Sequence, residues 1–165
     1  MLIIMAGLPG TGKSTLSRRL ARHFQAVHIR IDTIEHALAR SDRPVTGPEG
    51  YVVGYAIAAD NLGLGSTVIA DSVNPLTITR AAWRDVASRA GVTYCEVEVV
   101  CSDPSEHRHR VESRQSDISG FRVPTWEEVV NREYVPWETD RIVIDTAGTA
   151  EDQSFARLLA ALPQG

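Results

Sequence analysis

The strongest constraint on this chain lies in its first fifteen residues. An uninterrupted apolar run, residues 2–6, has the pattern of a strand that is buried on both faces. It leads directly into residues 7–15, GLPGTGKST, which match the pattern G-x-x-x-x-G-K-[ST] at every fixed position. A strand, a glycine-rich loop and a helix start therefore follow one another in the order that a phosphate-binding P-loop requires. We expect this segment to bind a nucleoside triphosphate.

Each residue type of the loop has a physical role in holding phosphate. Glycine lets backbone N–H groups approach the phosphate oxygens, because no Cβ stands in the way. Lys13 offers a mobile positive charge to the outer phosphates, and the Ser14 hydroxyl is a ligand for Mg²⁺. The N-terminus of the following helix adds a favourable dipole. The predicted nucleotide-binding residues of the loop are Gly7, Gly10, Thr11, Gly12, Lys13, Ser14 and Thr15.

Length and composition predict one globular domain that spans residues 1–165, with 43% hydrophobic and 23% charged residues. The net charge of −4 gives no general attraction to nucleic acid or to anionic membranes. The apolar start is too short for a signal peptide or a membrane span. Cys95 and Cys101 are expected too far apart along one strand to form a disulfide, which favours a cytoplasmic location.

Alternating strands and helices follow the loop. After the first strand, the expected strands cover residues 27–31, 67–70, 92–100 and 141–145, with helical patterns between them. Strands joined by helical crossovers form parallel sheets. The sequence therefore predicts an α/β fold: a five-stranded parallel sheet with helices on both faces. Ligands in such sheets bind beyond the carboxyl ends of the strands.

Three helix starts are predicted from capping residues. Residues 32–35 have the form of a capping box that begins at Asp32. Asn74 precedes Pro75, as an N-cap precedes the proline favoured at the first helical position. Residues 103–106 combine a cap, a first-turn proline and a glutamate. Residues 41–50, with two prolines and two glycines, are expected to form a surface loop.

Arginines on the predicted helices fall into two groups. Arg110 and Arg114 lie four residues apart and are expected on one face of the helix that begins near residue 103. Cationic groups that close over a transferring phosphoryl group stabilise its charge, so both are candidate catalytic residues. Arg18 and Arg80 are instead expected on solvated helix faces.

Four segments together resemble one group of enzymes: the P-loop, the segment at Asp32, residues 68–71 (VIAD) and the arginine-bearing helix after residues 101–103 (CSD). The chain resembles the small P-loop kinases, in the group that contains polynucleotide 5′-hydroxyl kinases, chloramphenicol phosphotransferase, zeta-toxin-like kinases and gluconate kinase-like enzymes. The resemblance covers nearly the whole chain. It implies the P-loop NTPase fold, ATP and Mg²⁺ as cofactors, a helical lid at about 103–125, and transfer of the γ-phosphoryl group to a hydroxyl.

The resemblance also implies roles for residues that follow strands. Asp32 is the expected general base, which accepts the proton of the attacking hydroxyl; its competing role is that of a helix cap. Asp71 is expected to hold Mg²⁺ through water or, together with Asn74, to bind the substrate hydroxyls. The choice between Asp32 and Asp71 as the base stays open. Thr146 and Gly148 resemble the loop that lines adenine in these kinases, although a plain turn explains them equally well.

Three functions remain open. A kinase acting on a small-molecule hydroxyl is the leading one, followed by a kinase acting on the 5′-hydroxyl of a polynucleotide or nucleoside. The third is a nucleotide-binding regulatory module with little catalysis. Polynucleotide kinases carry an arginine three residues after the aspartate, whereas this chain has Glu35, which would repel a substrate phosphate. A GTPase is disfavoured, because no N-K-x-D segment follows the D-x-x-G at residues 145–148. The sequence predicts neither the phosphate acceptor nor the oligomeric state.

Overall fold

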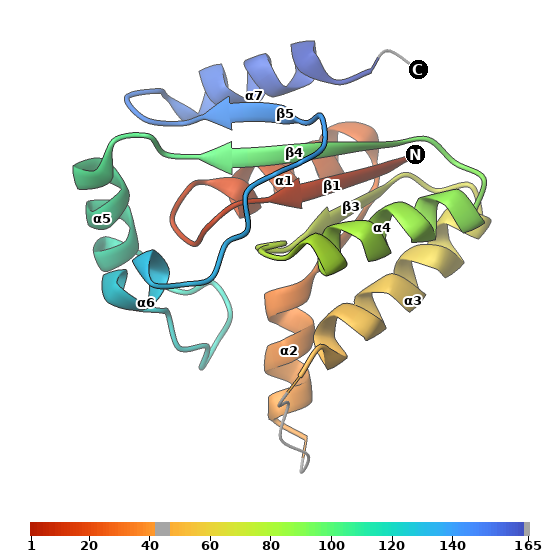
Figure 1. Ribbon diagram of the computed structural model, residues 1–165, viewed down its shortest axis with the longest axis horizontal. Coiled ribbons are helices and arrows are strands. Elements are labelled where there is room, and N and C mark those ends of the chain that lie inside the picture. Colours follow the sequence, from red (N-terminus) through yellow and green to blue (C-terminus); the bar gives the residue numbers. More distant parts are fainter. Residues whose placement is uncertain (42–46, 164–165) are drawn as a thin grey trace.

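The computed structural model describes residues 1–41 and 47–163. Five strands form one parallel sheet with the order β2-β3-β1-β4-β5 (Figure 1). The strands are β1 (Leu2–Ala6), β2 (Val27–Arg30), β3 (Val68–Asp71), β4 (Tyr94–Val100) and β5 (Ile142–Asp145). This confirms the predicted five-stranded parallel sheet. The strand that precedes the P-loop, β1, is the central one, so the loop starts from the middle of the sheet.

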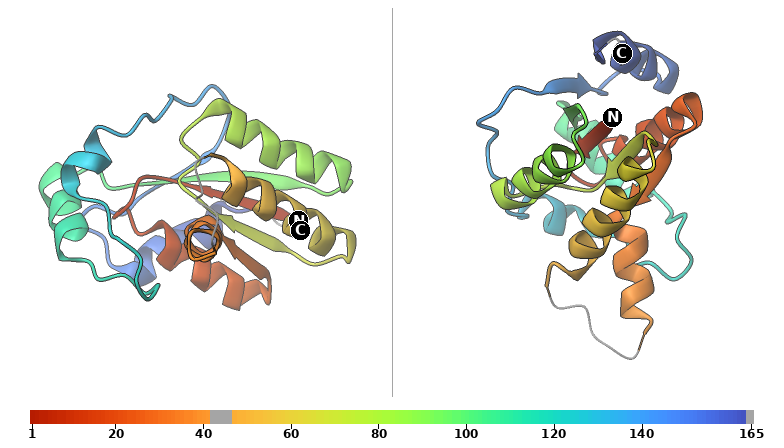
Figure 2. Two further views of the ribbon diagram at one scale, coloured as in Figure 1. Left: turned by 90° about the horizontal axis from the view of Figure 1, so that it is seen from below. Right: turned by 90° about the vertical axis from the view of Figure 1, so that its right-hand side faces the viewer.

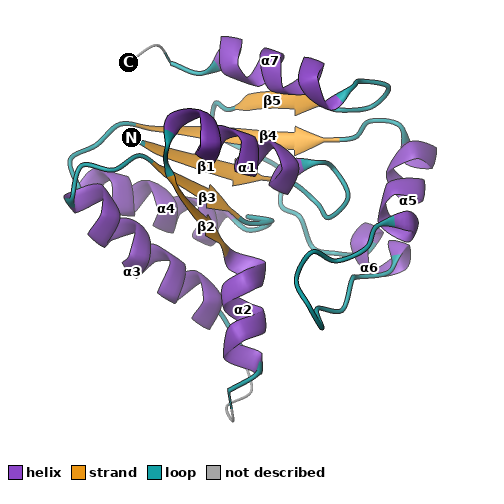
Figure 3. Ribbon diagram, turned by 180° about the vertical axis from the view of Figure 1, so that it is seen from behind, coloured by secondary structure: helices purple, strands orange, loops and turns teal. Residues whose placement is uncertain are grey.

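Helices cover both faces of this sheet, as predicted (Figure 3). The α1 and α7 helices pack on one face, and α3 and α4 pack on the other. The bounds are α1 (Lys13–Phe24), α2 (Ile31–Ala39), α3 (Glu49–Gly63), α4 (Thr77–Arg89), α5 (Pro104–Ser113), α6 (Trp126–Val130) and α7 (Glu151–Ala161). Of the remaining three helices, α2 continues from the end of β2 and packs against α3, while α5 and α6 lie beyond the carboxyl end of β4 (Figure 2, left).

The core consists of two apolar layers that share β1. Successive side chains of a strand point to opposite faces, so Leu2 and Ile4 pack in one layer while Ile3 and Met5 pack in the other. Trp83 of α4 is fully buried in the first layer. Each fully buried leucine, isoleucine or methionine side chain of β1 contributes roughly 1.5–3 kcal/mol. A strand with no exposed residue on either face anchors the loop that follows it.

The predicted helix starts are confirmed at one place and wrong at two. Asp103 caps α5, because its carboxylate accepts from the backbone N–H groups of the second and third residues that follow. Asp32 is not a cap: β2 runs directly into α2, so Asp32 lies in the first turn and Arg30 occupies the N-cap position. Asn74 does not begin α4, which starts at Thr77. Of the predicted loop at 41–50, residues 42–46 lie outside the described residues, and α3 begins at Glu49.

Arg80 binds the segment that precedes α4. The prediction of a solvated Arg80 is wrong, since this residue is only 2% exposed. Its guanidinium donates to four backbone carbonyls, two before α4 and two between α6 and β5, and it lies 4.0 Å from the ring centroid of Trp137. The accepting residues are Asn74, Pro75, Val135 and Pro136. The segment 133–141 is thereby fixed across the sheet face beside α4.

This segment also explains two buried glutamates of β4. Glu96 accepts from the Thr139 hydroxyl at 3.1 Å and from Arg84 of α4 at 2.9 Å. Glu98 accepts from Arg141 at 2.6 Å and from the Tyr134 hydroxyl at 3.0 Å. A polar crossover segment, rather than an apolar helix, therefore covers this part of the sheet. Both cysteines are free thiols. Within residues 1–41 and 47–163, each helix is too short or too polar to traverse a bilayer.

Candidate active site

The P-loop has the backbone that a phosphate cradle requires. Gly7, Gly10 and Gly12 all have positive φ, at 139°, 86° and 90°. A Cβ on Gly7 would lie 2.2 Å from the backbone oxygen of Val99 on β4, so only glycine fits there. The α1 helix begins at Lys13, directly after the loop, and its amino end therefore points at any phosphate held there.

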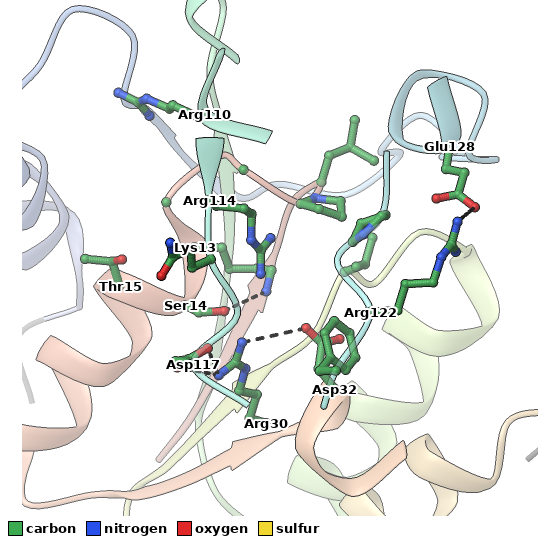
Figure 4. Close-up of a pocket in the computed structure, with 18 of the residues that line it drawn as sticks. Lys13, Ser14, Thr15, Arg30, Asp32, Arg110, Arg114, Asp117, Arg122 and Glu128 are labelled. Atoms are coloured by element: carbon green, nitrogen blue, oxygen red, sulfur yellow. Dashed lines mark hydrogen bonds and ion pairs between the residues drawn. The ribbon is translucent and has the colours of Figure 1, made fainter. Parts of the chain in front are cut away.

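A pocket of about 640 Å³ opens beside the loop (Figure 4). One wall is the P-loop with the start of α1, a second is the junction of β2 with α2, and a third is the chain from α5 to α6. The lining is strongly charged. Its charged residues are Lys13, Arg18, Arg30, Asp32, Glu35, Arg110, Arg114, Asp117, Arg122, Glu128 and Arg132.

Asp71, at the end of β3, is joined to the P-loop below the pocket. Its Oδ1 accepts from Lys13 Nζ at 2.5 Å and from Ser14 Oγ at 3.2 Å, and its Oδ2 lies 3.2 Å from His28 Nε2. Burial alone raises the pKa of this carboxyl, but the Lys13 ammonium and the His28 hydrogen bond outweigh burial, and the net pKa is well below the ordinary value. Asp71 is therefore an anion paired with the P-loop lysine.

The junction of β2 with α2 places two acidic side chains in the pocket wall. Asp32 lies in the first turn of α2, and its Oδ2 is 4.0 Å from Arg30 Nη2. Glu35 follows one turn later. Burial raises the pKa of Glu35, and the neighbouring charge of Asp32 raises it further. Gly50 packs against Glu35 so closely that a Cβ on this glycine would lie 2.3 Å from Glu35 Cγ.

Both predicted lid arginines line the pocket, but they do not share a helix face. Arg110 is in the last turn of α5 and contacts Thr146 at two atoms, its hydroxyl at 2.8 Å and its carbonyl at 2.9 Å. It also pairs with Glu106 at 2.5 Å. Arg114 has an extended backbone with ψ of 140°, because α5 ends at Ser113. The expectation of one helical face is therefore wrong. Both residues line the pocket, but the Arg110 guanidinium is turned away from Arg114 (Figure 4).

Arg18, Arg30 and Asp117 form an ion-pair cluster that sequence patterns did not indicate. Arg30 Nη1 donates to both carboxylate oxygens of Asp117, at 2.9 and 2.8 Å, and Arg18 Nη1 donates to Oδ2 at 2.5 Å. The expectation that Arg18 only faces solvent is wrong, since this residue lines the pocket. The helical pattern showed only that Arg18 avoids the core. The position of Arg30 two residues before Asp32 was the one available signal.

The remaining predicted site residues lie around the pocket rather than in its lining. The Thr146 hydroxyl lies 2.9 Å from the Thr11 carbonyl, so it ties the β5–α7 loop to the P-loop. Gly148 N–H donates to Glu106 at 2.8 Å. Asn74 is fully buried, and its side chain donates to the Met5 carbonyl of β1 at 3.1 Å. This side chain therefore contacts the sheet and does not face the pocket. The structure therefore does not bring Asn74 to the substrate side, and the adenine-lining role of residues 146–148 stays a prediction.

A glycine-rich loop between a central parallel strand and a helix, with its lysine beside an aspartate of the neighbouring strand, defines a P-loop nucleotide-binding protein. A family model described as an AAA domain matches residues 2–132. The chain belongs to this family of P-loop kinases.

The comparisons with individual proteins agree with this assignment. A shikimate kinase of Corynebacterium efficiens is 30% identical over 146 residues, which cover 75% of this chain and 86% of that protein. Chaetomium thermophilum Kti12, solved in complex with ADP-AlF3, superimposes with a TM-score of 0.70 and 23% identity, covering 99% of this chain and 100% of its own. A gluconokinase of Sinorhizobium meliloti gives a TM-score of 0.67 at 16% identity, covering 96% of this chain and 89% of its own. At these identities the two structures establish a shared fold.

Proposed function

We propose that this protein transfers the γ-phosphoryl group of ATP to a hydroxyl of a small molecule. The observation that carries the proposal is the composition of the pocket, where the P-loop forms one wall and the Asp32 carboxylate another. Phosphoryl transfer needs a nucleotide, an acceptor hydroxyl and a proton acceptor in one place. The relatives named shikimate kinase and gluconokinase support a small hydroxyl compound as the acceptor.

Within this proposal the P-loop holds the triphosphate. The backbone N–H groups of residues 7–15 surround the phosphates, and Lys13 leaves Asp71 to neutralise the outer ones. Arg110 and Arg114 approach from the opposite wall and stabilise the charge of the transferring group. The β5–α7 loop with Thr146 and Gly148 borders the adenine.

Ser14 and Asp71 fit a magnesium site. Their side-chain oxygens lie 3.2 Å apart beside the loop, and Mg²⁺ prefers oxygen ligands and takes few from the protein when phosphates supply the rest. When bound, the ion would neutralise charge on the phosphate oxygens. Ser14 would hold it directly, and Asp71 would orient it through water.

The geometry favours Asp32 over Asp71 as the general base. Asp71 is fully buried, and its two carboxylate oxygens already face Lys13, Ser14 and His28. The Asp32 side chain is 30% exposed and lines the pocket, so an acceptor hydroxyl can reach it. Because ATP is the phosphoryl donor and both cysteines are free, we propose the cytoplasm as the compartment.

The test is a phosphoryl-transfer assay with γ-labelled ATP. The acceptor panel contains shikimate, gluconate, glycerol 3-phosphate, their uncharged analogues, aminocyclitol and chloramphenicol-type antibiotics, and a 5′-hydroxyl oligonucleotide. We expect label in at least one small molecule. Lys13→Ala and Asp32→Asn should each lower kcat/KM by about 10²–10⁴-fold, while Asp85→Asn, a surface substitution on α4, leaves it unchanged.

Two results would contradict the proposal. Labelling of the oligonucleotide alone would identify a polynucleotide kinase. Binding of ATP without label in any acceptor would instead favour a nucleotide-binding regulatory module. Normal turnover by Asp32→Asn would remove only the assignment of the base.

A further inference from the structure

The carboxylate of Asp117 occupies a site that two arginines build at the floor of the pocket. Arg30 donates to both of its oxygens (Figure 4). Arg18 donates to one. The Arg30 side chain is only 9% exposed, and its Nε is buried without a hydrogen-bond partner among the described residues. A nearly buried guanidinium of this kind requires an anion, because an uncompensated buried charge is strongly unfavourable.

The two sides of this ion pair differ in how firmly they are held. Arg30 belongs to the end of β2 and is almost enclosed, whereas half of the Asp117 side chain is exposed. Asp117 lies between α5 and α6, in the segment that we expect to act as a lid. Burial raises the pKa of Asp117, but the hydrogen bonds and charge of Arg30 outweigh burial, and the net pKa is lowered. The arginines therefore present a fixed anion site, and Asp117 is an anion that solvent can reach.

The anion site and the proposed base are adjacent. The same Arg30 guanidinium places Nη1 at Asp117 and Nη2 at 4.0 Å from Asp32 Oδ2. A molecule with an anionic group in the place of the Asp117 carboxylate would therefore have its nearby atoms beside Asp32. One compact compound can satisfy both contacts.

We propose that Arg18 and Arg30 bind an anionic group of the phosphate acceptor, and that the Asp117 carboxylate competes with the acceptor for this site. The acceptor is then a small hydroxyl compound that also carries a carboxylate or a phosphate monoester. Exchange of one anion for another keeps the Arg30 charge compensated, so the exchange leaves no buried charge unpaired. This inference rests on the proposed kinase function, because that function defines the acceptor.

A polyanion fits this pocket less well than a small anion. Asp32, Glu35 and Glu128 also face the cavity, and their carboxylates would repel the further phosphates of a nucleic acid strand. Arg18 and Arg30 form the basic site between β2 and α1, while two other basic residues of the lining, Arg110 and Arg122, are paired with Glu106 and Glu128. The Arg18 and Arg30 site therefore accommodates one anionic group.

The binding test uses matched pairs of compounds that differ in one charge. Shikimate is compared with methyl shikimate, gluconate with glucose, and glycerol 3-phosphate with glycerol, each titrated by calorimetry into the full chain saturated with Mg²⁺ and AMPPNP. We expect the anionic member of at least one pair to bind at least tenfold more tightly. The carboxylate and phosphate pairs separate the two chemistries.

Three variants test the residues. Arg30→Gln should weaken binding of the preferred anion at least tenfold and leave its neutral analogue unchanged. Asp117→Asn should strengthen binding of the anion several-fold, because the competitor has lost its charge. Arg108→Gln removes the same charge from an exposed pair on α5 and should change neither affinity. If Arg30→Gln fails to fold, Arg18→Gln replaces it, with the same expected selectivity for the anion.

The outcomes separate this inference from the kinase proposal. Equal binding of charged and neutral members, or no effect of Asp117→Asn on the anion, would overturn the anion site even if a neutral compound is phosphorylated. Binding of an anion that depends on Arg30 would uphold the site, including when no compound is phosphorylated and the kinase proposal fails.

Discussion

Asp71 and Lys13 form a charge pair that is almost completely removed from solvent. The carboxylate is 1% exposed, and its partners Lys13, Ser14 and His28 come from the P-loop, α1 and β2. A buried pair of this kind contributes little compared with two apolar residues, but loss of one partner leaves the other charge uncompensated. Any triphosphate that recruits Lys13 must therefore also compete with Asp71.

Asp71→Asn should lower the free energy of unfolding by about 3–5 kcal/mol at pH 7, because the Lys13 ammonium then stays buried without an anion. Urea denaturation followed by circular dichroism, without added nucleotide, measures this difference. The matched control is Asp85→Asn, which removes a carboxylate from an exposed pair with Arg89 and should cost less than about 1 kcal/mol.

The contribution of the Asp71–Lys13 pair to the free energy of unfolding depends on pH. The pKa of Asp71 is lower in the folded protein than in the unfolded chain, so its contribution is complete above the ordinary aspartate pKa. It is lost as the pH falls toward the folded pKa. The difference in unfolding free energy between wild type and Asp71→Asn should therefore begin to shrink below about pH 4. A difference that stays constant down to pH 3 would contradict this account.

The conformation of the P-loop depends on close packing against the neighbouring strand β4. Gly7 has a positive φ and no room for a Cβ, because the Val99 carbonyl of β4 lies 2.2 Å from that position. Gly65, after α3, has a similarly positive φ but no atom within 4 Å of the position that a Cβ would take. An alanine would strain the backbone at both positions, but it would overlap a neighbouring atom only at Gly7.

Gly7→Ala should lower the free energy of unfolding by more than about 3 kcal/mol, since the loop or β4 must move to relieve the overlap. Gly65→Ala should cost only about 1–2 kcal/mol, from backbone strain. Chemical denaturation of both variants measures the two values, and equal values would mean that the overlap is relieved without cost. Gly7→Ala should also weaken nucleotide binding, which Gly65→Ala leaves unchanged.

The segment between α6 and β5 depends on one arginine of α4. Arg80→Ala should lower the free energy of unfolding by about 3 kcal/mol or more, because it removes charged hydrogen bonds and leaves backbone carbonyls unpaired. Arg89→Ala on the same helix removes an exposed side chain and should cost less than about 1 kcal/mol. Faster proteolysis within residues 133–141 of Arg80→Ala alone would support the local role of this contact.

Local sequence patterns predicted the elements whose causes are local. The apolar run before the P-loop and the cap at Asp103 each act within a few residues, and both appear as expected. The predicted start of α4 was wrong because Asn74 has a left-handed backbone and its carbonyl accepts from Arg80, which the N-cap pattern does not reveal. The predicted set of pocket residues was also incomplete. Arg18 and Asp117 form an ion pair although they are 99 positions apart in the chain, and a local pattern does not reveal such a contact.

The whole molecule brings these distant parts together through its strand order. Because β1 is central, the P-loop lies between the β2–α2 junction on one side and the α5–α6 region on the other (Figure 1). In the proposed function, three separate stretches of the chain bind the nucleotide and the acceptor. A ligand that contacts several stretches at once stabilises the folded state as a whole.

This linkage predicts that Mg²⁺–AMPPNP raises the melting temperature of the protein. At a ligand concentration of 100 times Kd the stabilisation is about 2.7 kcal/mol. For a domain of this size, that corresponds to an increase in Tm of roughly 5–10 °C. Differential scanning fluorimetry over a nucleotide titration measures the shift. Lys13→Ala should abolish most of it, because the phosphates lose their cationic partner, whereas Arg108→Gln should preserve it. An equal shift in Lys13→Ala would show that the nucleotide binds away from the P-loop.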